Sequence, residues 1–159
     1  MSIKSITRAA AVAALYVVLT LLTNAVGLAS GVIQVRLSEA LCILPMFTPA
    51  AIPGLFIGCI LANLLTGAVV WDIVFGSLAT LIGAIGTYFL KKQKWLAPLP
   101  PVLANAIIVP LVLRFAYAVP DAILFMILTV GAGEIISIYG VGMLLLYPVV
   151  KKFAPKLFG

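Results

Sequence analysis

The chain has 159 residues, of which 65% are hydrophobic and 9% charged, and ten Lys and Arg against four Asp and Glu give a net charge of +6. A water-soluble domain of this length has too little interior to hide so much apolar surface, so the bilayer must be its solvent. About 20 apolar residues cross a bilayer core, which leaves room for roughly five or six crossings and no separate catalytic module. We expect one integral membrane domain over residues 1–159.

Basic residues flank apolar segments in three clusters, which are Lys4 with Arg8, then Lys91, Lys92 and Lys94, and finally Lys151, Lys152 and Lys156. Lys and Arg next to membrane helices favour the cytoplasmic side. All three clusters can be cytoplasmic if four crossings precede Lys91 and two follow it. The charges therefore predict an all-α membrane protein with six transmembrane helices and cytoplasmic N- and C-termini. Because these charges cap apolar segments, we expect no nucleic-acid partner.

The first predicted helix covers residues 5–27 and begins with small side chains spaced four apart, as Ala9/Ala13 and Ala10/Ala14. This spacing lets another backbone approach closely, which is how helices associate in lipid. The segment also resembles a cleavable signal peptide with small residues at 27–29. We favour an uncleaved helix, because the charge pattern requires it for an even number of crossings.

After the first helix we predict an outer loop, a short apolar segment and two further helices. Residues 27–37 form an outer loop in which the alternation at 31–36 predicts an extended stretch. Residues 41–47 are too few to cross the core upright. Two further helices are then predicted at 53–66 and 72–90.

The second half begins with an inner link at 91–101 and a helix at 102–118 that Pro110 should kink. Residues 120–153 are too many for one simple span, and Gly131 and Gly133 predict a break. We expect an interfacial helix at 121–130 and a last crossing at 132–150. Glu134 would then lie near the outer end of that crossing, whereas without a break it would lie about 20 Å deeper than Asp121.

Polar residues gather in the predicted outer half of an otherwise apolar chain. Placing a charged side chain at bilayer depth costs about 2.5–3.5 kcal/mol of free energy, so we expect a residue such as Glu134 to have a compensating partner or a function. A mixture of carboxylates, amides, a guanidinium and an indole suits a flat polar ring, whose N–H donors, edges and face these groups match. The candidate substrate-binding residues are Arg36, Glu39, Asn63, Trp71, Asp72, Asn105 and Glu134.

Each candidate also has a structural alternative. Arg36 and Glu39, three residues apart, are also typical of a local ion pair. Trp71 is also typical of the interfacial aromatic belt, and Asp72 of a helix N-cap. The two asparagines are also typical of hydrogen bonds between membrane helices.

Several chemistries lack the residues that they need. Two cysteines and no histidine cannot fill a four-ligand zinc site, and without histidine there are no Ser-His or Cys-His nucleophile pairs. No Gly-Lys-Ser/Thr phosphate loop occurs, so ATP would have to be used by another protein. We expect no enzyme, no metal and no cofactor.

Three runs of sequence carry a family resemblance, and they are Val35–Pro45, Pro53–Asn63 and Trp71–Thr80. They resemble the queuosine-precursor transporter (QueT-type) family, whose members are substrate-binding S components of energy-coupling factor (ECF) transporters. The resemblance implies the six-helix S-component fold in a bacterial plasma membrane, with a pocket opening outward. It also implies a membrane coupling subunit and two cytoplasmic ATPases as partners. The coupling subunit would meet an Ala-x-x-x-Ala patch on the first helix, formed by Ala9, Ala10, Ala13 and Ala14.

The resemblance implies queuine, queuosine or a related 7-deazaguanine precursor as the ligand. A guanine-like edge carries N–H donors and a carbonyl, and such precursors carry an amine. The expected partners are Glu134 or Glu39 for the donors, Arg36 or Asn105 for the carbonyl, Asp72 for the ammonium and Trp71 for stacking. Three alternatives stay open: an S component for another vitamin such as a riboflavin- or folate-like one, a proton-coupled transporter with Glu134 as proton carrier, and a scaffold without a ligand.

Overall fold

The computed structural model describes residues 2–28 and 33–158, and the regular structure in these two ranges is entirely helical. The all-α prediction is therefore confirmed. Ala29 of the expected signal-like site lies outside the described residues, as do Gly31 and Val32 of the expected extended stretch.

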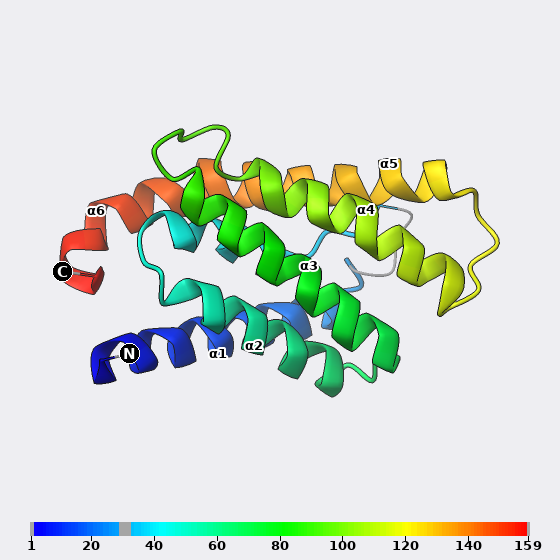
Figure 1. Ribbon diagram of the computed structural model, residues 1–159, viewed down its shortest axis with the longest axis horizontal. Helices are drawn as coiled ribbons and strands as arrows, with labels where there is room; N and C mark the ends of the chain where they lie inside the picture. The colour runs from blue at the N-terminus through cyan, green and yellow to red at the C-terminus, as the bar shows by residue number, and fades with distance from the viewer. Residues whose placement is uncertain (1, 29–32, 159) are drawn as a thin grey trace.

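Most of the helices follow one another as antiparallel neighbours (Figure 1). Helices α5, η2 and α6 join without interruption into one helix of 36 residues. The elements in chain order are α1 (Ile3–Ala25), the 3-10 helix η1 (Leu37–Met46), α2 (Ala51–Leu65), α3 (Val70–Phe89), α4 (Leu99–Phe115), α5 (Ile123–Glu134), the π-helix η2 (Ile135–Leu146) and α6 (Tyr147–Phe158).

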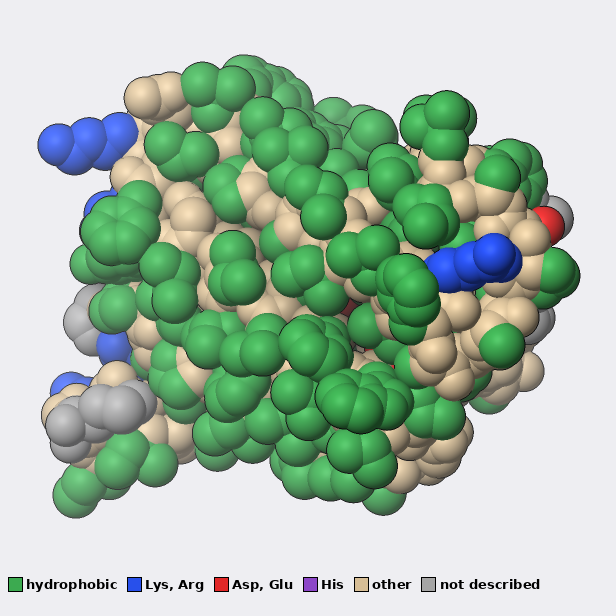
Figure 2. All heavy atoms as spheres, turned by 45° about the vertical axis from the view of Figure 1, so that its right-hand side comes forward, with side chains coloured by type: hydrophobic (Ala, Val, Ile, Leu, Met, Phe, Trp, Pro, Cys, Tyr) green, Lys and Arg blue, Asp and Glu red, His purple; other side chains and the backbone are tan. Residues whose placement is uncertain are grey.

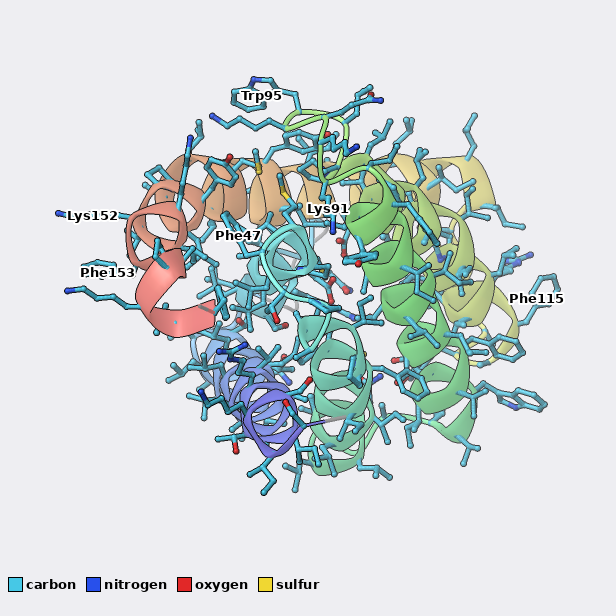
Figure 3. All side chains as sticks on the ribbon, turned by 60° about the vertical axis from the view of Figure 1, so that its left-hand side comes forward. Phe47, Lys91, Trp95, Phe115, Lys152 and Phe153 are labelled. Atoms are coloured by element: carbon cyan, nitrogen blue, oxygen red, sulfur yellow. The ribbon has the colours of Figure 1, made fainter. Side chains whose placement is uncertain are left out.

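Both termini and the link between α3 and α4 lie at the same end of the molecule (Figure 1). We call this the basic end, because it carries Lys4, Arg8, Lys91, Lys92, Lys94, Lys151, Lys152 and Lys156. Lys152 and Phe153 project outward from α6 (Figure 3). Apolar side chains cover the face between the two ends (Figure 2). The opposite end carries the α2–α3 turn and the α4–α5 link.

Three helices in the described ranges are long and apolar enough to cross a bilayer: α1, α3 and the continuous helix Ile123–Phe158. The remaining helices η1, α2 and α4 are apolar but shorter. The length and composition of these helices suit a membrane-embedded protein. Six crossings and cytoplasmic termini stay predictions.

Helix α1 packs against α2 through glycines that leave no room for a side chain. A Cβ atom added to Gly54 would lie 2.6 Å from the carbonyl oxygen of Ala9, and one added to Gly58 would lie 3.0 Å from Cα of Ala13. Ala9 and Ala13 are accordingly buried, at 8% and 7% exposure. The small residues of this face therefore serve close helix packing within the chain.

The 3-10 helix η1 runs through the centre of the bundle. Every residue from Ser38 to Pro45 is buried, and η1 packs against η2, α1 and α3. The segment at 41–47, expected to be too short to cross, is thus part of a core element that is wrapped by other helices. Glu39 comes to lie in the interior because it belongs to this element.

The predicted helix break at Gly131 and Gly133 is wrong, because the helix continues through both residues. Gly133 has another use: a Cβ atom there would lie 2.1 Å from the backbone oxygen of Gln34, so the missing side chain admits the segment before η1. Without a break, Glu134 lies roughly 16 Å along the helix axis from Ile123. It is therefore deep in the bundle and not near the end of a crossing.

Replacing Gly58 with Val should force α1 away from α2. We expect a loss of roughly 1–3 kcal/mol, the typical cost of overpacking. Gly140→Val is the matched control, since a Cβ atom at Gly140 meets nothing within 4 Å. Thermal unfolding in detergent measures both variants, and equal midpoints for the two would contradict the assigned packing.

Candidate functional site

Two buried carboxylates share one amide at the centre of the bundle. The side-chain nitrogen of Asn105 on α4 donates to Glu39 Oε2 at 3.3 Å and to Glu134 Oε2 at 3.2 Å. The exposed fractions of Glu39, Asn105 and Glu134 are 1%, 3% and 5%. We call these three residues the carboxylate cluster. It ties η1, α4 and the long last helix together by charge-assisted hydrogen bonds.

The two carboxylates differ in how fully they are bonded. The Tyr16 hydroxyl donates to Glu39 Oε1, and the Cys42 thiol donates to Glu39 Oε2 at 3.2 Å. Glu134 receives only the Asn105 bond from the residues that the structure describes. Glu39 is therefore held on both oxygens, whereas one oxygen of Glu134 keeps its acceptor capacity.

A polar cavity of about 290 Å³ lies at the opposite end, between the ends of α1, α2 and α3, the segment before η1 and the α4–α5 link. Polar side chains dominate its wall, which is unusual in a chain of this composition. It is lined by Tyr16, Thr20, Thr23, Asn24, Arg36, Ser38, Asn63, Thr66, Gly67, Ala68, Asp72 and Tyr117.

Asp72 is fixed in this wall by hydrogen bonds from two other elements. The Tyr117 hydroxyl donates to Asp72 Oδ2 at 3.2 Å, and the Asn63 amide donates to the Asp72 backbone oxygen at 3.3 Å. Partial burial raises the pKa of the Tyr117 hydroxyl. The N-cap of α3 is Val69, without a side-chain cap, so the N-cap alternative for Asp72 is wrong. Asn63 does join two helices, as its structural alternative predicted.

Arg36 brings a positive charge to the same cavity. Its side chain is half-buried, and its guanidinium interacts electrostatically with the carboxylates of Asp72, Glu39 and Glu134. In the described part of the chain Arg36 and Glu39 form no ion pair, so the local ion-pair alternative is wrong. The guanidinium therefore interacts with three carboxylates at longer range, and none of its N–H groups donates a hydrogen bond to the residues that the structure describes.

The predicted residues thus fall into two layers. Arg36, Asn63 and Asp72 line the polar cavity, whereas the carboxylate cluster lies outside its wall. Tyr16 connects the two layers, since it lines the cavity and donates to Glu39.

Trp71 is not brought to the cavity. It is 60% exposed and stacks on Phe75, with ring centroids 6.0 Å apart. Both rings line an apolar groove of about 770 Å³ between α3 and α4. Phe115 lines the same groove and points away from the helices (Figure 3). Trp71 therefore lies on the apolar surface that would face lipid, and not where it could stack on a ligand in the cavity.

Sequence reasoning missed nine of the twelve described residues of the wall, among them Tyr16, Ser38 and Tyr117. The Ser38 hydroxyl is buried and has no hydrogen-bond partner within the described ranges. Tyr16 follows Ala9 and Ala13 at helical spacing, which could have placed it on the buried face of α1. Nothing in the sequence signals Tyr117, because it depends on how the α4–α5 link folds back. No group of three or more His, Cys, Asp and Glu side chains that could hold a metal occurs among the described residues.

Asn105→Leu should destabilise the protein, because both carboxylates lose their shared donor. The expected loss is roughly 1.5–3 kcal/mol for each hydrogen bond to a charged group. Adding Glu134→Gln should restore part of that loss, since one of the two buried carboxylates that lost their donor is then replaced by a neutral amide. Chemical unfolding of the single and double variants measures the coupling. A double variant that is no more stable than Asn105→Leu alone would contradict this arrangement.

The family profile described as "QueT transporter" matches residues 6–151. The "Queuosine precursor transporter QueT" of Lactococcus lactis subsp. cremoris (strain MG1363) is 40% identical over 73 residues, which cover 46% of this chain and 43% of that protein, so the match spans less than half of either. No solved structure matches the chain. The family match covers most of the sequence, and the chain therefore belongs to the QueT transporter family.

Proposed function

We propose that this chain is the substrate-binding S subunit of an ECF-type importer, and that its polar cavity captures queuosine, queuine or a related 7-deazaguanine precursor. The observation that carries the proposal is the cavity itself, where Arg36 and Asp72 face a common space in an otherwise apolar protein. The relative from Lactococcus lactis, which is named as a queuosine precursor transporter, supports the choice of ligand.

The charges around the cavity favour a ligand that carries an amine. This region of the described structure contains three carboxylates, on Glu39, Asp72 and Glu134, and one guanidinium, on Arg36. A carboxylate held away from bulk water needs either a proton or a positive partner. An ammonium group on the ligand would supply one positive charge next to Asp72.

The remaining groups suit the edge of a guanine-like ring. Arg36 offers N–H donors to a ring carbonyl, and Ser38 offers a hydroxyl that has no partner of its own. A volume of about 290 Å³ is at the lower limit of ligand pockets, which suits a single bicyclic base with a short substituent. The carboxylate cluster lies deeper in the bundle, and Tyr16 links it to the cavity by its hydrogen bond to Glu39.

The proposed importer needs partners. Ala10 and Ala14 are exposed on α1, whereas Ala9 and Ala13 pack against α2. The exposed pair is therefore the part of the predicted alanine patch that can meet a coupling subunit. Two cytoplasmic ATPases would drive uptake, with the basic end facing the cytoplasm of a bacterial cell and the cavity facing outward.

One observation favours a second candidate function, which is proton-coupled transport by the chain alone. Glu39 and Glu134 accept hydrogen bonds from the same amide nitrogen deep in the bundle, and paired acids at membrane depth are typical of proton relays. Under this alternative, purified protein in liposomes would move the ligand in response to a pH gradient without any ATPase. Under the main proposal such liposomes bind the ligand and do not accumulate it.

Calorimetry on the purified chain tests the ligand class directly. We expect saturable binding of 7-deazaguanine bases, tightest for one that carries an aminomethyl group, and no binding of riboflavin. Guanine serves as the control for the ring shape. Binding of riboflavin without binding of any 7-deazapurine would reject the substrate assignment.

Asp72→Asn should weaken binding of the aminomethyl ligand by about 1.5–3 kcal/mol, the value of a hydrogen bond to a charged group. Binding of the same base without the amine should change little. Asp121→Asn is the matched control, since Asp121 is exposed at the same end but does not line the cavity. An equal loss for both ligands would show that Asp72 does not recognise the amine.

A further inference from the structure

The segment that carries Arg36 rests directly on the long last helix. A Cβ atom added to Gly133 would lie 2.1 Å from the backbone oxygen of Gln34 and 2.9 Å from its carbonyl carbon. The backbone two residues before Arg36 therefore occupies the space that a side chain at position 133 would fill. The neighbouring Gly131 has no such role, because its added Cβ atom meets only Ala106 Cβ, at an ordinary 3.6 Å.

One helical turn further on, Ser137 holds the backbone of Arg36 itself. Its hydroxyl donates to the Gly133 carbonyl at 2.8 Å and accepts from the Arg36 backbone N–H at 3.1 Å. The next amide, of Leu37, donates to the Thr23 hydroxyl of α1 at 3.3 Å. Ser137 and Thr23 are each 1% exposed. Two buried hydroxyls from different helices thus fix consecutive amides at the entry to η1.

We propose that Gly133 and Ser137 are positioning residues, and that together they form a backbone seat that sets how deeply the Arg36 guanidinium enters the polar cavity. The inference rests on the proposed function, in which Arg36 donates to the ligand carbonyl. A long, flexible arginine in a site of this size needs a fixed backbone origin, because a site about 1 Å too loose loses its function. The seat also explains why a glycine occupies position 133, which sequence reasoning assigned to a helix break.

The seat itself can be tested on the empty protein by hydrogen exchange of the peptide that covers residues 33–37. Gly133→Ala should displace Gln34 and remove protection of the Arg36 and Leu37 amides, and Ser137→Ala should remove that of Arg36. Gly131→Ala should leave exchange as in the wild type. Unchanged protection in Gly133→Ala would overturn the proposal, whether or not the wild-type protein binds any 7-deazapurine.

The positioning role is tested by binding of the aminomethyl 7-deazaguanine. Gly133→Ala should weaken binding about 10- to 100-fold, as expected for a lost hydrogen bond to a charged group, and Gly131→Ala should not. In an Arg36→Gln background, Gly133→Ala should cause no further loss, which general destabilisation of the fold would not predict. If Gly133→Ala fails to fold, Ser137→Ala is measured instead, both alone and in the Arg36→Gln background.

If Gly133→Ala reduced ligand affinity equally in the wild-type and the Arg36→Gln backgrounds, the positioning role would be overturned. Failure of the wild-type protein to bind any 7-deazapurine would instead reject the proposed function. The hydrogen-exchange result would then decide by itself whether Gly133 and Ser137 form the backbone seat.

Discussion

Burial of the Glu39 and Glu134 carboxylates beside each other is the constraint on which the rest of this structure depends. A bundle made of apolar helices can hold two such groups only if donors and a positive charge reach them. Asn105 supplies donors to both, Tyr16 and Cys42 supply donors to Glu39, and Arg36 supplies the charge. Five segments of the chain are thereby required to meet at one place.

The two helices that carry these acids are both irregular, and this irregularity gives the cluster its geometry. Glu39 lies on a 3-10 helix, and Glu134 lies where an α-helix passes into a π-helix. Such helices are uncommon at this length and π segments frequently mark functional sites. They pack on each other in the centre of the bundle, and the polar cavity lies above them, toward the opposite end. A ligand in the cavity would therefore lie against rigid, fully packed elements.

Much of this could be predicted from the sequence. The apolar segments and their basic flanks gave the helical fold and its common basic end, and the lone polar residues pointed to Arg36, Asn63 and Asp72. The role of Gly133 could not be predicted, because a glycine that breaks a helix and one that admits a neighbouring backbone look alike in sequence. The outward direction of Trp71 and the reach of Tyr117 to Asp72 depend on helix rotation and on loop folding, which residue types alone do not determine.

The most direct measurement is an experimental structure of the chain with an aminomethyl 7-deazaguanine bound. We predict the bicyclic ring inside the polar cavity, with its amine at Asp72 and its carbonyl at Arg36, and with Asn105 still bridging Glu39 and Glu134. A ligand bound elsewhere, for example in the apolar groove beside Trp71, would contradict it.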